Sequence, residues 1–345
     1  MVHLGVTLFI GGVFGFLFFK LRVPGGMMVG ALLAVSVLSV CTDWAYMPSY
    51  ARVAAQITAG AFIACTVEKS DLKRLPHIVK PAAILLGGML CLNLLMGFLI
   101  HAVTDLDWIT SFMCAVPGGM SDTPIIAADM GGNGGKVAVM QFARLLTGIG
   151  VFPSLILTVT KKEAIPQQEA RVQTHSSEGK HPAEFILTVV VAGVFGVIGK
   201  LSGVPVGALL FALIGVIALK LLFDRAYLPM WMKRAAQVLS GCYIGSSVTL
   251  QDVVELKDLI PAVILLLLGY MVACLAIGRV MAKTCGMSRR ESMLAATPAG
   301  ASDMALISAD LGIQSPDLIV LQVVRMLVVI SLFPQIIHLL VRFLT

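Results

Sequence analysis

The chain has 345 residues, of which 58% are hydrophobic and only 13% are charged. Soluble domains carry about 25% charged residues, so this composition excludes an ordinary soluble enzyme or binding domain. The net charge of +6 comes from Lys and Arg residues in short loops between apolar stretches, where membrane proteins keep the charge that sets their topology. The seven cysteines form no CxxC pair, so we expect packing cysteines rather than disulfides or a zinc site.

Apolar stretches long enough to cross a bilayer recur along the whole chain. In the first half they cover residues 2–19, 23–40, 51–67, 78–103, 109–130 and 137–160. The opening residues, MVHLGVTLF, lack the basic start and cleavage site of a secretory signal, so we expect a retained helix there. The predicted fold class is therefore an all-α, polytopic membrane protein.

A shift of 181 residues superimposes the second half of the chain on the first without a gap. Among the residues that coincide are Pro24 with Pro205, Tyr46 with Tyr227, Gln56 with Gln237, and Gly60 with Gly241. Between the halves lies a polar, charged stretch that is too hydrophilic to cross a bilayer. We therefore predict a first membrane repeat over residues 1–160, a polar linker over 161–184 and a second membrane repeat over 185–345.

The fifth apolar segment of each repeat is interrupted by helix breakers. In the first repeat the stretch CAVPGGMSDTPIIAADMGGNGG, residues 114–135, holds two prolines, six glycines and two aspartates. Its counterpart 181 residues later keeps the same pattern. The shared residues are Pro117, Gly119, Ser121, Asp122 and Asp129 in the first repeat and Pro298, Gly300, Ser302, Asp303 and Asp310 in the second.

The distribution of Lys and Arg predicts how the repeats are oriented. If each fifth segment enters the membrane and returns, and the N-terminus lies outside, 18 basic residues fall on the cytoplasmic side. Five fall outside, namely Arg52, Lys136, Lys200, Lys257 and Arg342. If all twelve segments cross, the better orientation gives 14 against nine. Because basic residues collect in cytoplasmic loops, we predict inverted repeats, each with five crossings and one re-entrant hairpin.

The breaks predict a helix N-terminus inside the protein. Pro117-Gly118-Gly119 ends one half-helix, and Ser121-Asp122 before Pro124 is the pattern of a capped helix start. Such a terminus carries partial positive charge and free N–H groups, which suit an anion or a carboxylate. Residues Pro298, Gly300, Ser302 and Asp303 form the second tip. Asp122 and Asp303 either take up a coupling proton or cation, or only cap their helices.

A glutamine and an arginine follow each hairpin, three residues apart and so on one helix face. They are Gln141 and Arg144 in the first repeat and Gln322 and Arg325 in the second. An arginine inside a membrane helix needs a partner. Either it binds an anionic substrate, or it pairs permanently with Asp129 or Asp310; we favour the pair, because it accounts for both signs of charge at once.

These motifs resemble the AbrB family of bacterial integral membrane proteins, whose members carry this duplicated module. The resemblance rests on AVPGGMSD with VMQFARLL and on ATPAGASD with LQVVRMLV, and it covers both repeats. It implies a location in the bacterial inner membrane. The family is also similar to cation-proton antiporters and anion transporters, which implies a secondary transporter but says little about the substrate.

The family has also been labelled an ammonia monooxygenase and a regulator of gene expression. A copper or iron oxygenase needs clustered ligands, but the six histidines are dispersed, so we expect no enzyme, no metal and no cofactor. A membrane sensor that affects transcription indirectly stays an alternative, whereas direct contact with nucleic acid is not expected. The expected partners are the lipid bilayer and a small solute or ion, and a homo-oligomer is left open.

The sequence favours a secondary transporter that moves a small solute by alternating access, and an anion is one candidate for that solute. The predicted substrate or ion site comprises Pro117, Gly118, Gly119, Ser121, Asp122, Asp129, Gln141, Arg144, Pro298, Gly300, Ser302, Asp303, Asp310, Gln322 and Arg325.

Overall fold

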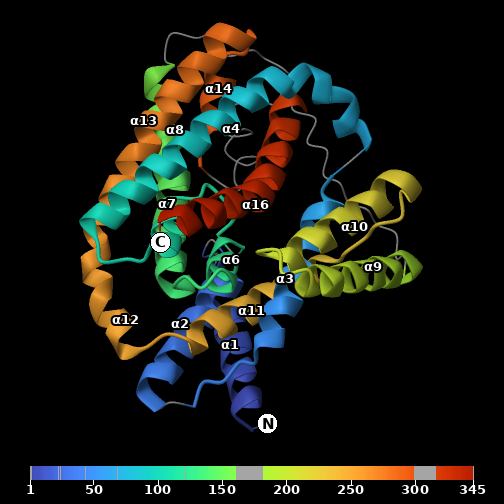
Figure 1. Ribbon diagram of the computed structural model, residues 1–345, viewed down its shortest axis with the longest axis vertical. Helices are drawn as coiled ribbons and strands as arrows, with labels where there is room; N and C mark the ends of the chain where they lie inside the picture. Colours follow the sequence, from blue (N-terminus) through green and yellow to red (C-terminus); the bar gives the residue numbers. More distant parts are fainter. Residues whose placement is uncertain are drawn as a thin grey trace.

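The computed structural model describes residues 2–21, 23, 25–42, 44–67, 69–120, 122–160, 182–298 and 316–344. Within these ranges every regular element is a helix, in agreement with the predicted all-α class (Figure 1). The first half contains α1 (Val2–Lys20), α2 (Gly26–Thr42), α3 (Ser49–Cys65), α4 (Lys69–Val103), α5 (Trp108–Cys114), α6 (Thr123–Asp129), α7 (Gly134–Gly150) and α8 (Phe152–Val159). The second half contains α9 (Pro182–Leu201), α10 (Gly207–Phe223), α11 (Met230–Ser246), α12 (Leu250–Glu255), η1 (Leu256–Leu259), α13 (Ile260–Cys285), α14 (Arg289–Ala296) and α16 (Pro316–Leu344).

Several helices have the length and composition of membrane spans. Five described stretches qualify, Val2–Lys20, Pro76–Val103, Pro182–Leu201, Lys257–Cys285 and Asp317–Leu344. Their outer faces are apolar although they are exposed, as at Phe9 in α1, which is 72% exposed, and Val272 in α13, which is 66% exposed. Large exposed apolar side chains along whole helices suit lipid rather than water. The chain is therefore a membrane protein.

Equivalent helices of the two halves make equivalent contacts. The hydroxyl of Thr7 in α1 donates to the His3 carbonyl at 2.8 Å and accepts from the Tyr46 amide at 3.0 Å. Thr188 in α9 does the same, with the Glu184 carbonyl at 2.7 Å and the Tyr227 amide at 3.0 Å. Each residue of the second set lies 181 positions after its counterpart. In each half the loop between the second and third helices is thus attached to the first helix by the same bonds.

The two halves also interlock. α11 packs against α2, and α3 packs in the same way against α10. Both contacts depend on a glycine, because a Cβ added at Gly60 would lie 2.4 Å from the Leu209 carbonyl oxygen, and one added at Gly241 would lie 2.5 Å from that of Met28. Small residues at such crossings let two backbones approach closely. Close packing of helices at Gly60 and Gly241 is thus part of the fold.

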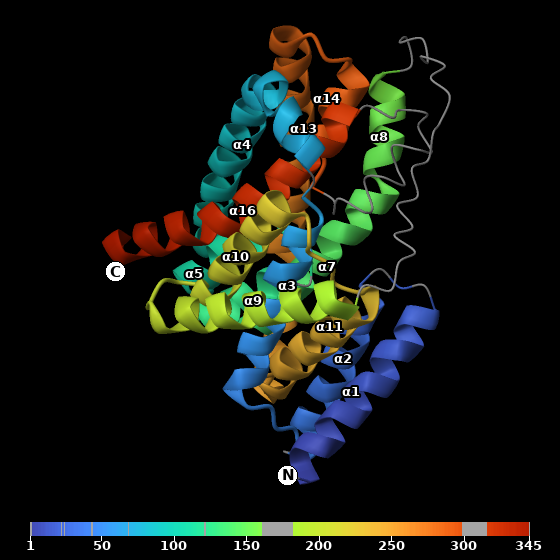
Figure 2. The ribbon, with the colours of Figure 1, turned by 90° about the vertical axis from the view of Figure 1, so that its right-hand side faces the viewer.

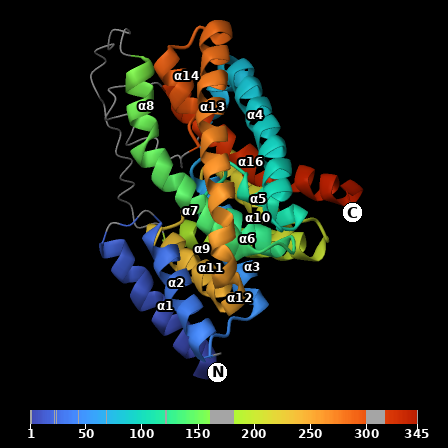
Figure 3. The same cartoon turned by 90° about the vertical axis from the view of Figure 1, so that its left-hand side faces the viewer.

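The short helices α5 and α6 lie in the middle of the molecule. Figures 2 and 3 show α4, α13 and α14 at one end and α1 and α2 at the other, with α5, α6 and α7 between them. The largest apolar core surrounds α5, since Phe112, Met113 and Cys114 are fully buried there with side chains of α4, α13 and α16. The fifth predicted segment, residues 109–130, is therefore two helices and an internal turn rather than one span.

The glycine contacts lead to a stability prediction. Replacing Gly60 or Gly241 with Ala should force the two halves apart and lower the thermal unfolding temperature of the purified protein by several degrees. Gly12 and Gly193 are matched controls, because they also differ by 181 positions and a Cβ at either meets nothing within 4 Å. Ala at these control positions should leave stability unchanged or raise it slightly, since Ala favours a helix by about 1 kcal/mol over Gly. Equal effects at all four positions would contradict this packing.

Candidate functional site

α5 ends inside the protein after two turns. Asp107 caps its start by accepting a hydrogen bond from the Thr110 amide at 2.9 Å, and the helix ends at Cys114. Pro117 cannot continue a helix, because it lacks an N–H. The last carbonyls of a helix have no partner within it. Here they lie among fully buried residues, so they need donors from other parts of the chain.

Two buried side chains of α7 supply most of these donors. The Gln141 amide nitrogen lies 3.2 Å from the Met113 carbonyl oxygen and 3.1 Å from that of Val116. Arg144 donates from Nη1 to the Val116 carbonyl at 2.8 Å and from Nη2 to the Gly118 carbonyl. Gln141 is 0% exposed and Arg144 is 2% exposed. The guanidinium therefore sits at the negative end of the α5 dipole, where a cation is stabilised.

Two further helices complete this set of donors. The Tyr270 hydroxyl in α13 donates to the Ala115 carbonyl at 2.7 Å, and the Asn93 amide in α4 donates to the Phe112 carbonyl at 2.9 Å. Both side chains are buried. We refer to Asn93, Gln141, Arg144 and Tyr270 as the capping cluster. It ties the end of one short helix to three long elements of the protein.

The second half repeats this arrangement at the end of α14. Arg325 Nη1 donates to the carbonyls of Ala295 at 3.0 Å and Thr297 at 2.6 Å, and Gln322 donates to that of Leu294 at 3.3 Å. Cys274, at the position equivalent to Asn93, has its sulfur 3.4 Å from the carbonyl of Met293. The predicted pairing of each Gln and Arg on one helix face thus serves the same purpose twice.

The predicted ion pair between Arg144 and Asp129 is wrong. Asp129 ends α6 on the side that faces α3, where its Oδ1 lies 3.1 Å from Arg52 Nη2. Its Oδ2 accepts from the Val206 amide at 3.2 Å, and Arg52 also donates to the Ala128 carbonyl at 3.0 Å. Arg144 points to the end of α5 instead, because the carbonyls there supply the negative partial charge that it needs.

Asp122 lies at the start of α6, as predicted, but its side chain does not cap the helix. It is the N-cap residue, with Pro124 in the first turn, yet its carboxylate makes no capping hydrogen bond. The loop is closed by backbone bonds instead, from the amides of Asp122 and Thr123 to the Gly119 carbonyl. A Cβ added at Gly119 would lie 2.6 Å from Asp122 Oδ2, so a larger residue there would displace this carboxylate.

The start of α5 meets the end of α6. The Asn133 amide donates to the Thr110 hydroxyl at 2.8 Å, and a Cβ added at Gly132 would lie 3.0 Å from a side-chain carbon of Ile109. Residues 108–133 thus form a hairpin whose two ends touch. Its turn, around Pro117, Gly118 and Gly119, is the part farthest from these ends along the chain.

Polar contacts also hold the outer end of the hairpin. Asn133 caps α7 by accepting from the Lys136 amide at 3.0 Å, and its own amide donates to Asp252 at 2.6 Å. Partial burial alone would raise the pKa of Asp252, but hydrogen bonds from Thr249 and Asn133, together with the charge of Lys136, hold that pKa below its ordinary value. The ionised carboxylate therefore joins α12 to the hairpin.

Five residues of the predicted site lie outside the described residues. They are Ser121, Gly300, Ser302, Asp303 and Asp310. The structure brings Gln141 and Arg144 to the backbone from Met113 to Gly118, and it brings Gln322 and Arg325 to the backbone just before Pro298. Asp122 lies at the same turn, whereas Asp129 belongs to the separate contact with Arg52.

Sequence reasoning missed several residues that the structure brings to the hairpin, among them Arg52, Asn93, Val206 and Tyr270. Arg52 could have been found, because Lys233 lies 181 positions later and keeps the positive charge. Asn93 is matched by Cys274 and Tyr270 by Met89, so the repeat gave no identity at these positions. Val206 acts through its backbone amide, which no side-chain pattern can indicate.

Comparison with known proteins identifies the family to which the chain is similar. The family model described as "Transition state regulatory protein AbrB" matches residues 27–341. An Escherichia coli (strain K12) protein named "Putative regulator AbrB" is 24% identical over 326 residues, which are 92% of this chain and 91% of that protein. A Bacillus subtilis (strain 168) protein named "Uncharacterized protein YhjN" is 26% identical over 263 residues, 72% of this chain and 68% of that protein.

The capping cluster leads to a second stability prediction. Arg144→Leu removes the charged donor of the Gly118 carbonyl and one of the two donors of the Val116 carbonyl, the other being Gln141. Since a hydrogen bond to a charged group contributes about 1.5–3 kcal/mol, we expect the free energy of unfolding to fall by about 3 kcal/mol. Arg144→Lys keeps the charge but not the bidentate geometry of the guanidinium. The unfolding temperature of this variant should therefore lie between those of Arg144→Leu and wild type. Thermal unfolding in detergent measures this, with Arg342→Leu at an exposed position as the control. An unfolding temperature of Arg144→Leu equal to that of wild type would refute the role given to Arg144.

Proposed function

Because the chain belongs to the AbrB family and its helices are those of a membrane protein, we propose that it is a secondary transporter. It moves a small solute across the bacterial inner membrane, which it crosses many times, by alternating access between the two sides. The observation that carries this proposal is the hairpin of residues 108–133, a pair of short helices whose inner end is held by the capping cluster.

Interrupted helices at membrane depth have a known physical requirement. In hydrocarbon each unpaired backbone group costs several kcal/mol, so such breaks persist only where protein buries them or where they line a cavity. Transporters built from repeats use broken helices to form a substrate site near the middle of the membrane. The capping cluster meets the cost at the carbonyl end of α5, and the set around Arg325 does so at the end of α14.

We further propose that the two repeats are inverted. The re-entrant arrangement places 18 basic residues on the cytoplasmic side and five outside, the better of the two counts. The bond between Thr110 and Asn133 supports it, because a segment whose ends touch returns to the side from which it started. An odd number of crossings in each repeat then turns the second repeat over relative to the first.

Asp122 is the residue that we assign to coupling. It lies at the hairpin turn, and its carboxylate makes no capping bond and no ion pair with another described residue. An ionisable side chain at such depth is costly unless it has a function. In this proposal Asp122 takes up a proton or cation, and the change in its charge shifts the balance between the two states of the transporter.

The alternative function, a membrane sensor that affects gene expression, is supported by the name of the E. coli relative, "Putative regulator AbrB". In our proposal any effect on transcription follows from transport of a solute that signals, with no contact to nucleic acid. We propose no enzymatic activity, no cofactor and no metal, since the histidines are dispersed along the sequence. The partners in this proposal are the lipid bilayer and the solute, and a homo-oligomer is compatible with it.

The coupling role is tested with Asp122→Asn. Proteoliposomes on a solid-supported membrane are challenged with organic anions, organic cations and amines, and the solute that gives the largest current with wild type is then used. The variant should lose at least about nine-tenths of this current, since a group that carries the coupling charge is replaced by a neutral one. It should keep the wild-type unfolding temperature, because no capping bond is lost.

Asp105→Asn, at an exposed residue between α4 and α5, is the matched control and should transport normally. Full transport by Asp122→Asn would confine Asp122 to a structural role. No current from wild type with any solute of the panel would contradict the transporter itself.

A further inference from the structure

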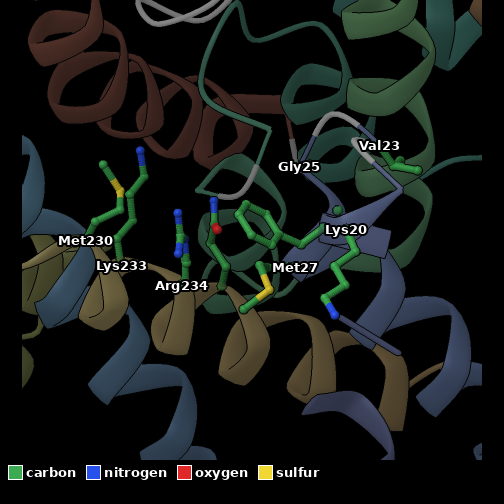
Figure 4. A pocket seen from close by; sticks show the side chains of 10 residues that line it. Lys20, Val23, Gly25, Met27, Met230, Lys233 and Arg234 are labelled. Atoms are coloured by element: carbon green, nitrogen blue, oxygen red, sulfur yellow. The ribbon is translucent and has the colours of Figure 1, made fainter. Parts of the chain in front are cut away.

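A basic pocket lies where the end of α1 and the start of α2 face α11. It has a volume of about 540 Å³, which is within the usual range for small-ligand sites. Lys233, Arg234 and Met230 of α11 form one wall, and Lys20, Gly25 and Met27 form the opposite one (Figure 4). The lining contains no acidic residue among those described.

The chain contains its own template for what such a pocket binds. At the start of α10 the carboxylate of Asp129 is held by Arg52 at 3.1 Å and by the Val206 amide at 3.2 Å. Val206 has a φ of +58°, in the left-handed region that a β-branched residue rarely adopts. That strained turn directs its amide toward the carboxylate. The contact is thus a carboxylate site built from one cation and one backbone N–H.

The equivalent groups at the start of α2 line the pocket. Lys233 lies 181 positions after Arg52, and Gly25 lies 181 positions before Val206 and has nearly the same φ, +64°. The next amide, that of Gly26, donates to the Val23 carbonyl at 2.9 Å, just as that of Gly207 donates to the Val204 carbonyl at 2.9 Å. The Gly25 amide has no acceptor among the described residues, and Lys233 has no carboxylate there; its Nζ lies 4.3 Å from the centre of the Phe62 ring.

The pocket is also more positive than its template. The pocket has Arg234 where the template, at the position equivalent by the shift of 181 residues, has Val53. It likewise has Lys20 where the template has Leu201. The guanidinium of Arg234 lies 4.3 Å from the centre of the Phe19 ring, and this cation–π contact holds it at the pocket wall. Three cations without an acidic partner in the described lining attract an anion from solution. Arginine in particular suits a carboxylate, because it can donate two parallel hydrogen bonds.

The pocket adjoins the hairpin turn. A Cβ added at Gly25 would lie 2.7 Å from the sulfur of Met120, so the residue two before Asp122 packs directly on the pocket wall. Lys233 is close enough to Asp122 for its charge to act on that carboxylate. A ligand bound to Lys233 would therefore alter the charge that Asp122 experiences.

From these observations we infer that the pocket between α1, α2 and α11 binds a small organic carboxylate through Lys233, Arg234 and the Gly25 amide. This inference rests on the proposed transport function, and within it the carboxylate is the transported solute. In the inverted-repeat topology that we propose, Lys20, Lys233 and Arg234 are among the 18 basic residues on the cytoplasmic side, so the pocket opens toward the cytoplasm.

Ligand-induced stabilisation of the purified protein tests the inference. Acetate and succinate are compared with phosphate, and with ethylammonium chloride and sodium chloride at matched ionic strength. For wild type either carboxylate at saturation should raise the unfolding temperature by about 3 °C or more. Lys233→Gln and Arg234→Gln should each weaken binding by about tenfold or more, since each loses a charge-assisted hydrogen bond. Lys233→Arg keeps the positive charge and should bind the carboxylate about as tightly as wild type.

Lys200→Gln is the matched control, because Lys200 is exposed at the end of α9 outside the pocket. Asp310→Asn is a further arm, since Asp310 is the sequence equivalent of Asp129 and lies outside the described residues. Stabilisation by carboxylate only in Asp310→Asn would mean that the chain fills its own pocket, and it would overturn the inference. Stabilisation by phosphate or ethylammonium but not by carboxylate would overturn it as well.

Uptake of [14C]succinate and [14C]acetate into proteoliposomes separates this inference from the proposed function. Stabilisation without uptake would leave the pocket as a carboxylate site in a protein that does not transport it. Transport of another solute from the panel, without stabilisation by carboxylate, would leave the transporter and remove the carboxylate pocket.

Discussion

The rest of the structure depends on one constraint, which is that the carbonyls at the end of a helix broken inside an apolar core must find donors. α5 stops at Cys114 among fully buried residues, and Gln141, Arg144, Tyr270 and Asn93 donate to the backbone from Phe112 to Gly118. Without them several backbone groups would be buried unpaired, at a cost of several kcal/mol for each in hydrocarbon. The buried arginine is thus part of the scaffold, and its charge is already balanced by carbonyl dipoles.

This use of Arg144 changes which residues are available for function. Asp129 is occupied by Arg52 and the Val206 amide, whereas Asp122 at the turn has neither a capping bond nor an ion pair with the described residues. The rigid parts of the hairpin and its one uncommitted carboxylate are therefore different residues. Met120, two residues before that carboxylate, packs against Gly25 of a pocket whose cations also lack an acidic partner in the described lining.

Much of this architecture follows from the sequence, because the signals are local. Apolar length predicted the helices, Pro117 with Gly118 and Gly119 predicted the break, and three-residue spacing predicted that Gln141 and Arg144 act together. The partner of Arg144 could not be predicted, since backbone carbonyls supply the negative charge and leave no trace in residue types. Tyr270 and Asn93 escaped for a related reason. Their counterparts, Met89 and Cys274, differ, so the two halves satisfy similar carbonyls with different side chains.

The central claim is that residues 108–133 enter the membrane and return, which inverts the second repeat. Labelling with a membrane-impermeant maleimide tests it most directly, in a chain whose seven cysteines are first replaced. Single variants Asp105→Cys and Lys136→Cys flank the hairpin, and Ser177→Cys reports on the linker. We expect the first two to react only from outside the cell and the third only after the membrane is opened. Reaction of Asp105→Cys and Lys136→Cys from opposite sides would show that the segment crosses, and would contradict the account.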